Sequence, residues 1–196
     1  MRTHRVPRAD RISGATRRAS VAVPAAGLAI LAVTLLLAVS AHAATYHARV
    51  VAITDGNTLK AVHDGREIVV RLRWIDSPES GQRYSRQAKQ ALGELVTGQT
   101  VTVRDFGADA NGRRLADVVL PDGRNVNREL VRLGWAWWFR KYSRDVTLGT
   151  LEADARAAKR GLWADAHPVP PWEWRASQAS DRDGAGSVTP VKQLAP

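Results

Sequence analysis

Charged and hydroxyl side chains gather at the end of one apolar run in the first half of the chain. Arg71 lies in this run, and Asp76, Ser77 and Glu79 follow it closely. Oxygen donors of this kind suit a hard cation such as Ca²⁺, and a second carboxylate three residues further on can reach a nearby water. Taken alone, the same residues also fit a charged strand end followed by an Asp-Ser-Pro turn.

Two other segments carry similar chemical groups. Asp55-Gly56-Asn57-Thr58 is an oxygen-bearing loop that could contribute to a cation site, although an Asp-Gly pair also makes an ordinary hairpin turn. Arg113 follows the turn residues Asn111-Gly112. A guanidinium there can hold a phosphate through two hydrogen bonds, or it can be a plain surface arginine.

The elements that must position these residues are short strands separated by turns. Alternating apolar residues and Asp-Gly or Asn-Gly pairs predict strands at 46–53, 58–62, 67–75, 99–106 and 113–120. Apolar residues three and four apart predict helices at 82–96, 125–134 and 148–162.

This order of elements predicts a β-rich α+β fold. Five short antiparallel strands cannot bury two separate sheet faces, and closing them into a barrel removes the open edges. We therefore expect a five-stranded barrel of the oligonucleotide/oligosaccharide-binding (OB) fold, with three helices covering its ends.

The N-terminal segment has the pattern of a signal peptide. Residues 1–20 are rich in arginine, residues 21–39 are apolar, and Ala41-His42-Ala43 matches an A-x-A cleavage site. The alternative is an uncleaved membrane anchor, since the apolar run is just long enough to span a bilayer. Both place the folded domain outside the cytoplasm, in the periplasm or the extracellular space.

The remaining chain divides into a folded domain at 44–175 and a tail at 176–196. The tail is rich in Ser, Ala, Gly and Asp and is expected to be disordered. The whole chain has a net charge of +10, and without residues 1–43 it keeps 23 basic and 18 acidic residues, a net charge of +5. This surplus suits a polyanionic partner. The absence of cysteine excludes disulfides, zinc–thiolate sites and thiol catalysis.

Several motifs occurring in one order give the chain a family resemblance. They are Thr54-Asp55-Gly56-Asn57-Thr58, Arg71 with Asp76-Ser77-Pro78-Glu79, Asn111-Gly112-Arg113-Arg114-Leu115-Ala116, the run from Val126 to Ala136, and Arg160-Gly161-Leu162-Trp163. Over residues 46–174 the chain resembles the staphylococcal nuclease (thermonuclease) family. The resemblance implies the barrel fold and Ca²⁺-dependent hydrolysis of DNA and RNA that leaves 3′-phosphate ends.

The resemblance also implies a set of calcium ligands. Asp76 matches a calcium-binding aspartate of the family, and Ser77 matches a threonine whose backbone carbonyl binds the ion. Asn57 stands where the family usually has a second calcium-binding aspartate. An amide oxygen can still ligate calcium, but it carries no charge, so we expect weaker binding of the ion. Asp55 is close enough in the sequence that it could compensate.

Further roles follow from the same resemblance. Glu79 matches the glutamate that activates or orders the attacking water, and Arg71 and Arg113 match the two arginines that hold the scissile phosphate. Tyr142 matches a tyrosine beside the bound nucleotide, whereas Arg140 replaces the neighbouring tyrosine of the family.

These observations favour an exported nuclease that acts on DNA and RNA, is a monomer and meets a membrane only through an uncleaved N-terminal segment. One alternative is a catalytically weak or inactive nucleic-acid-binding module on the same barrel, which Asn57 makes conceivable. Another is a membrane-anchored interaction protein of the envelope. Glu79 argues for catalysis, because binding alone has no need of a carboxylate next to a phosphate.

Overall fold

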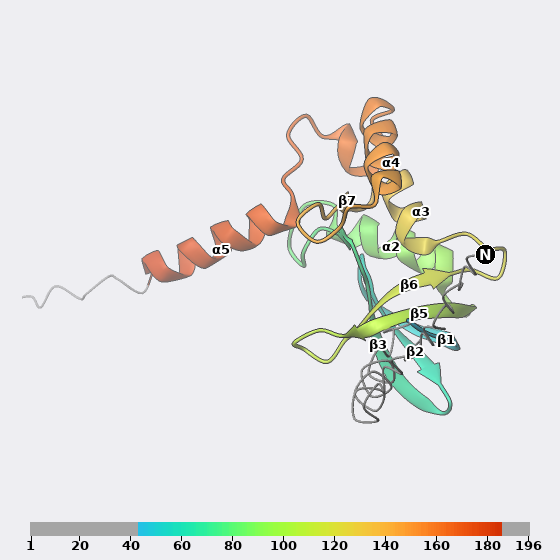
Figure 1. Ribbon diagram of the computed structural model, residues 1–196. Helices are drawn as coiled ribbons and strands as arrows, with labels where there is room; N and C mark the ends of the chain where they lie inside the picture. The colour runs from blue at the N-terminus through green and yellow to red at the C-terminus, as the bar shows by residue number, and fades with distance from the viewer. Residues whose placement is uncertain (1–42, 186–196) are drawn as a thin grey trace, which may run out of the picture. The chain divides into compact units, whose positions relative to one another are not determined.

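A closed barrel of five strands forms the centre of the computed structural model, which describes residues 43–185 (Figure 1). The strands are β1 (Ala44–Asp55), β2 (Thr58–His63), β3 (Arg66–Leu72), β5 (Thr100–Ala108) and β6 (Arg114–Val119). They lie in the order β1-β2-β3-β6-β5, with β5 paired back to β1. Only the β3–β6 pair of the barrel is parallel. The predicted five-stranded OB barrel is confirmed.

Alternation along the strands explains the inside of the barrel. Ala48 and Val50 on β1 are buried while their neighbours are not, and the same holds for Val101 and Val103 on β5. Each fully buried aliphatic side chain of this size stabilises the fold by about 1.5–3 kcal/mol. The predicted hairpin turn between β2 and β3 is also present, with φ angles of 47° at Asp64 and 74° at Gly65.

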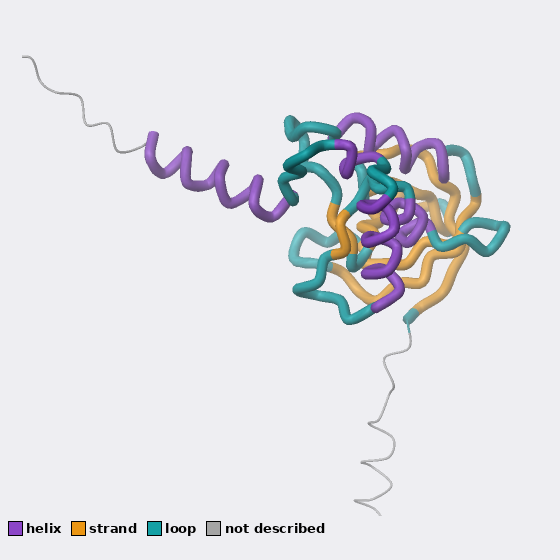
Figure 2. Tube along the Cα trace, turned by 90° about the horizontal axis from the view of Figure 1, so that it is seen from above, coloured by secondary structure: helices purple, strands orange, loops and turns teal. Residues whose placement is uncertain are grey.

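Three helices gather at one end of the barrel, as Figure 2 shows from above. They are α2 (Ser85–Val96), α3 (Val126–Arg132) and α4 (Val146–Ala157). The apolar stripe of α2 is buried against the barrel through Ala88, Leu92 and Val96. Asn125 caps α3, since its side-chain oxygen accepts a hydrogen bond from the backbone nitrogen of Arg128 at 3.0 Å.

The expected strand at 67–75 is interrupted. Trp74 has a φ of 66°, an unusual value for a bulky residue, and this conformation ends the ladder after Leu72. The chain then forms β4 (Ile75–Asp76), which pairs antiparallel with β7 (Trp137–Trp138) in a separate two-stranded sheet. As a result, Asp76 lies opposite Trp137, beside a segment that no local sequence pattern linked to it.

The third predicted helix is shorter than expected. α4 ends at Ala157 because Lys159 and Gly161 adopt left-handed φ angles of 50° and 54°. Leu162, which the spacing assigned to this helix, belongs to the short 3-10 turn η1 (Gly161–Ala164) and packs in a small cluster with Trp163.

A fourth helix, α5 (Pro171–Ala185), was not predicted and leads away from the barrel (Figure 1). The disordered tail was expected to begin at residue 176, but α5 continues for ten residues beyond Arg175. A proline in the first turn and Glu173 after it favour the start of a helix, and Ala, Gln and Arg are good helix formers. Residues 186–196 and the predicted signal segment up to residue 42 lie outside the described residues.

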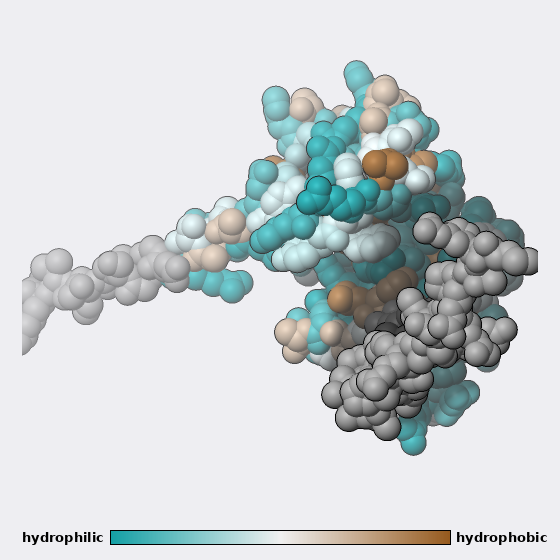
Figure 3. Space-filling model, viewed as in Figure 1, coloured by the Kyte–Doolittle hydropathy of each residue, from teal (hydrophilic) through white to brown (hydrophobic). Residues whose placement is uncertain are grey.

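The face seen in Figure 3 is mainly hydrophilic, and its hydrophobic residues form small patches. Within residues 43–185 no helix has the length and apolar character needed to cross a membrane.

Candidate active site

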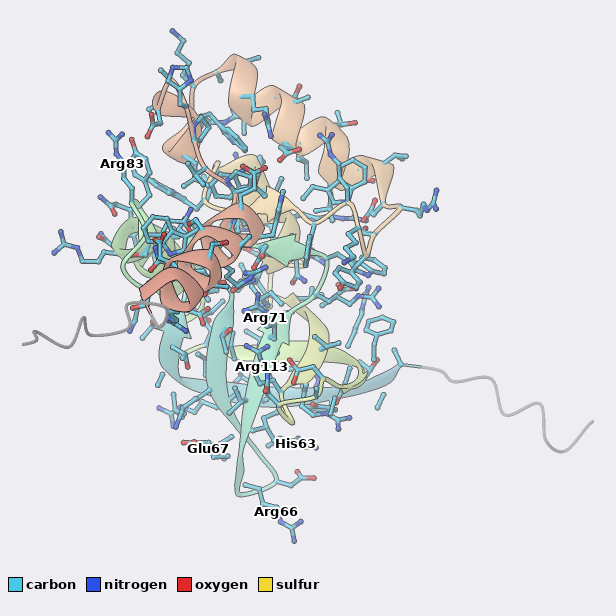
Figure 4. All side chains as sticks on the ribbon, turned by 90° about the vertical axis from the view of Figure 1, so that its left-hand side faces the viewer. His63, Arg66, Glu67, Arg71, Arg83 and Arg113 are labelled. Atoms are coloured by element: carbon cyan, nitrogen blue, oxygen red, sulfur yellow. The ribbon has the colours of Figure 1, made fainter. Side chains whose placement is uncertain are left out.

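Four of the predicted site residues line one cleft of about 730 Å³, called here the arginine cleft. They are Arg71, Glu79, Arg113 and Tyr142. In Figure 4, Arg71 and Arg113 lie close together, whereas His63, Arg66 and Glu67 are at the far end of the β2–β3 hairpin. Two guanidiniums and a carboxylate named in the sequence analysis therefore line the same cleft.

Arg71 is fixed by its place near the end of β3. It is paired with Thr58 of β2, and its Nη2 donates to Oδ1 of Asp76 at 2.7 Å. Asp76 is fully buried, and burial raises the pKa of its carboxyl, although the charges of Arg71 and Arg175 partly offset this effect. Removing either arginine would leave a buried carboxylate with less compensation.

Asn57 and Ser77 are buried and bonded to each other. Ser77 Oγ donates to Asn57 Oδ1 at 3.1 Å, and Asn57 Nδ2 donates to the carbonyl of Ile75 at 3.2 Å. These bonds join the β1–β2 turn to β4. Asp55 completes the turn by accepting a hydrogen bond from the Asn57 backbone nitrogen at 2.9 Å, and it also lines the arginine cleft.

Arg113 is held by an acidic partner in its own turn. Oδ2 of Asp109 accepts hydrogen bonds from Arg113 Nε at 2.8 Å and lies 2.7 Å from Nη2. Oδ1 of Asp109 accepts from the backbone nitrogens of Asn111 and Arg113. Burial raises the pKa of Asp109, but these bonds outweigh it, and the net effect is a lowered pKa. No sequence pattern assigned a role to Asp109.

Glu79 is positioned through its backbone. Its backbone nitrogen donates to Oε1 of Gln82 at 2.9 Å, and Nε2 of Gln82 donates to the carbonyl of Val169 at 2.7 Å. Gln82 is buried, so its amide links the turn before α2 to the segment that precedes α5. No sequence signal distinguished Gln82 from the helical pattern that follows it.

Arg175 is a second residue that the sequence did not reveal. Its Nη2 donates to Oδ2 of Asp76 at 2.9 Å, and its Nη1 donates to Oε1 of Glu79. The guanidinium therefore bridges two predicted site residues. Arg175 is close to 100 residues from both of them in sequence, and only the path of the chain through β7 and into α5 brings them together.

Tyr142 is 62% exposed at the edge of the arginine cleft. Its ring packs edge-on against Phe139 with centroids 4.7 Å apart, and Phe139 stacks on Trp172 at 5.3 Å. Arg140 points elsewhere: its Nη2 donates to Oε2 of the buried Glu152 at 2.8 Å, and it lines a neighbouring cavity of about 760 Å³. Arg140 thus does not replace the missing tyrosine at the cleft.

The donors near the cleft suit a hard cation. Among residues 43–185 there is no group of three or more His, Asp or Glu side chains that could hold a metal. The oxygen donors on offer are the Asp76 carboxylate, the Asn57 amide and the Ser77 carbonyl. A cationic group, the Arg175 guanidinium, already bridges Asp76 and Glu79. Oxygen donors are the ligands that divalent ions such as Ca²⁺ take, and this set carries less negative charge than one with aspartate at 57.

Comparison with known proteins shows that this sequence is similar to those of nucleases. A family model described as staphylococcal nuclease homologue matches residues 69–165. The chain is 46% identical over 132 residues to an uncharacterized endonuclease of Escherichia coli O157:H7. The aligned region covers 67% of this chain and 86% of that protein. The chain is also 37% identical over 161 residues to the micrococcal nuclease of Shigella flexneri, covering 76% of this chain and 92% of that protein.

Proposed function

Because the chain belongs to the staphylococcal nuclease family and hydrolyses phosphodiester bonds, we propose that it is an exported, calcium-dependent endonuclease of DNA and RNA. Its products carry 3′-phosphate ends. The observation that carries the proposal is the meeting of Arg71, Arg113 and Glu79 in one cleft.

The two guanidiniums bind and polarise the scissile phosphate. A phosphodiester repels a nucleophile because it is an anion, and its transition state concentrates further charge on the phosphoryl oxygens. Arg71 and Arg113 stabilise that charge more than the charge of the ground state, which lowers the barrier. Their partners Asp76 and Asp109 hold them in place before substrate arrives, so little ordering is needed during the reaction.

Glu79 acts on the water. Its carboxylate accepts a proton from the water as the water oxygen forms a bond to phosphorus. The bond from phosphorus to the 5′ oxygen breaks, and that oxygen takes a proton from solvent water and leaves as a 5′ hydroxyl. The phosphate stays on the 3′ side, which accounts for the proposed 3′-phosphate ends.

Calcium held by Asp76, Asn57 and the carbonyl of Ser77 supplies additional positive charge to the phosphoryl oxygens when it is bound. Asp76 must be ionised for this, and the charges of Arg71 and Arg175 oppose the rise in its pKa that burial causes. Because Asn57 is neutral, the site needs a higher calcium concentration than one with two aspartates. Tyr142 lies exposed next to the arginines, where its ring can contact a nucleotide.

The direct test incubates the purified protein with DNA and with RNA, in calcium and in chelator. We expect cleavage of both nucleic acids in calcium and none in chelator. The products should resist extension by a polymerase until a phosphatase removes the 3′-phosphate. Binding of nucleic acid without cleavage in any divalent ion would instead favour the inactive binding module.

The first mutational prediction concerns Arg113. Replacing it by alanine (Arg113→Ala) should lower the cleavage rate about 10²- to 10³-fold, the usual cost of losing one preorganised charge partner of the transition state. Thermal unfolding should change little, because Arg113 is at the cleft surface and pairs with a residue of its own turn. Arg66→Ala, at the far end of the β2–β3 hairpin, is the matched control and should cleave like the parent (Figure 4). Equal rates for Arg113→Ala and the parent would refute the role.

Export and oligomeric state complete the proposal. We propose that the signal segment is removed after Ala43 and that the nuclease acts as a monomer in the periplasm or the extracellular space. The start of β1 at Ala44 is compatible with a cut at this point. Mass spectrometry of the protein from its native compartment should find Ala44 as the first residue, whereas an intact N-terminus in the membrane fraction would favour the anchor.

A further inference from the structure

Arg175 makes contacts that the proposed reaction cannot keep. Its guanidinium donates to Oδ2 of Asp76 and to Oε1 of Glu79, while Arg71 takes the other oxygen of Asp76. Both oxygens of the carboxylate that would ligate calcium are therefore engaged by cations. The carboxylate that would accept a proton from water is engaged as well.

We propose that Arg175 is a built-in competitor of calcium: α5 delivers a guanidinium to the carboxylates of Asp76 and Glu79, and calcium binds only when Arg175 withdraws. The inference deepens the proposed function and rests on it, since it concerns how the same site acquires its ion.

Charge supports the competition. A guanidinium bridging two carboxylates satisfies them with charge-assisted hydrogen bonds, and a divalent ion at the same carboxylates would be repelled by it at short range. The neutral Asn57 acts in the same direction, because it removes a negative charge that would otherwise favour calcium over a monovalent guanidinium. Asn57 and Arg175 together set a high calcium requirement.

The way α5 is attached makes withdrawal feasible. Its first turn is anchored by Trp172, whose ring stacks on Phe139 with centroids 5.3 Å apart, and by Arg175 itself. Beyond Arg175 the described side chains of α5 are almost all exposed, and the helix leads away from the barrel (Figures 1 and 2). The part of α5 beyond Arg175 therefore has few buried contacts to lose if it moves, and elements with few buried contacts open at low cost.

The test compares calcium binding by the full-length protein and two variants. Arg175→Gln removes the competing charge, and Arg182→Gln, an exposed residue of the same helix, is the matched control. Titration calorimetry with calcium chloride, without nucleic acid, should give a dissociation constant roughly two- to fivefold lower for Arg175→Gln, as expected for loss of a partly exposed ion pair. Arg182→Gln should bind calcium like the parent.

A second measurement follows the helix itself. Calcium should accelerate amide hydrogen exchange in the first turns of α5 in the parent, because the ion displaces the side chain that holds them. In Arg175→Gln the same amides should exchange fast already without calcium. Calcium that slows exchange in the parent would contradict displacement and would overturn the inference.

The outcomes separate this inference from the proposed function. Unchanged or weaker calcium binding by Arg175→Gln overturns it, and a lower cleavage rate with unchanged calcium affinity would make Arg175 a phosphate-binding residue. If the parent cleaves in chelator and binds no calcium, the competition is refuted while the nuclease stands. If the parent binds calcium but does not cleave, the nuclease proposal fails and the titrations still decide the competition.

Discussion

Three arginines of the cleft are held by carboxylates: Arg71 by Asp76, Arg113 by Asp109, and Arg175 by Asp76 together with Glu79. Pairing fixes a long, flexible side chain in the position that a phosphate needs, so less conformational freedom is lost on binding. It also means that the phosphate competes with a carboxylate for the same guanidinium. Asp76 is shared by two arginines, and this makes it the residue on which both ion binding and arginine placement depend.

Asn57 gives a prediction at this scale. Asn57→Asp adds a carboxylate to the calcium site, and the calcium concentration for half-maximal cleavage should fall roughly tenfold, the effect of about 1.4 kcal/mol. Without calcium the same variant should be less stable than the parent, because the amide hydrogen bond to the Ile75 carbonyl is lost and a carboxylate takes its place. Calcium should remove this difference in stability between the variant and the parent.

Calcium titrations of activity and of melting temperature measure both effects. Asn125→Asp is the control: it makes the same charge change but keeps the cap of α3, since aspartate caps a helix as well as asparagine does. If Asn57→Asp and the parent give superimposable titrations, Asn57 is no calcium ligand.

The strands and hairpins could be predicted because their signals are local. Alternation along β1 and β5 and the Asp64-Gly65 turn depend on neighbouring residues only, and so does the Asn125 cap of α3. β4 and β7 pair across more than 60 residues, and each has only two residues, too few to show a period. α5 was missed because its Ser, Gly and Asp content suggested a tail, while its anchor, Trp172 on Phe139, is a tertiary contact.

The site residues likewise divide into those that local sequence reveals and those that only the fold brings together. Arg71, Asp76, Ser77 and Glu79 are adjacent in sequence, and the resemblance to a known family supplied the more distant Arg113. Arg175 matches none of the motifs that carried the resemblance, and only folding brings it to Asp76. Gln82 and Asp109 act through hydrogen bonds to backbone groups, and residue type alone does not show such bonds.

At the scale of elements, Gly56 lets the β1–β2 turn approach β4 and α2. A Cβ on Gly56 would lie 2.8 Å from the Cβ atoms of both Ser77 and Ala88, too close for any real pair of carbons. Gly56→Ala should therefore destabilise the fold by about 1–3 kcal/mol, the usual cost of overpacking, and should weaken calcium binding by shifting Ser77.

Gly93→Ala is the matched control for this substitution. Gly93 lies inside α2, where an added Cβ would be 3.5 Å from its nearest neighbour, an ordinary contact. There the same change should stabilise the protein by about 0.5–1 kcal/mol, because alanine loses less freedom than glycine in a helix. Urea unfolding of both variants checks the opposite signs, and equal effects at the two sites would mean that the approach of Ser77 to the turn is not tight.

At the scale of the whole molecule, the barrel is closed by β5, which joins β1 on one side and β6 on the other. Asp105 of β5 joins all three strands: Tyr46 Oη donates to its Oδ2 at 2.9 Å, and Arg114 Nε donates to the same oxygen at 2.5 Å. Gly107 donates its backbone nitrogen to Oδ1 at 2.8 Å. Burial raises the pKa of Asp105, but the bonds from Arg114, Gly107 and Tyr46 outweigh it and lower the pKa overall.

The same hydrogen bond shifts the pKa of Tyr46 in the opposite direction, upward. Burial, the hydrogen bond to Asp105 and the charge of Asp105 raise the pKa of Tyr46 to about 12. A raised pKa in the folded state contributes stability below the ordinary tyrosine value of about 10, and this contribution disappears as the pH rises toward 12. The lowered pKa of Asp105 contributes stability above the ordinary aspartate value of about 3.9, and this is lost as the pH falls through the folded-state pKa.

The barrel closure should therefore be sensitive to pH through Asp105. Asp105→Asn should lower the free energy of unfolding at pH 7 by about 1.5–3 kcal/mol, because hydrogen bonds to a charged acceptor are replaced by weaker ones. The difference from the parent should shrink as the pH falls below 4, because the unfolded parent takes up a proton at Asp105 there while the folded state resists protonation down to its lower pKa. Urea unfolding at pH 7, 5 and 3 measures this convergence. A difference that stays constant down to pH 3 would show that packing at residue 105, not its charge, holds the three strands together.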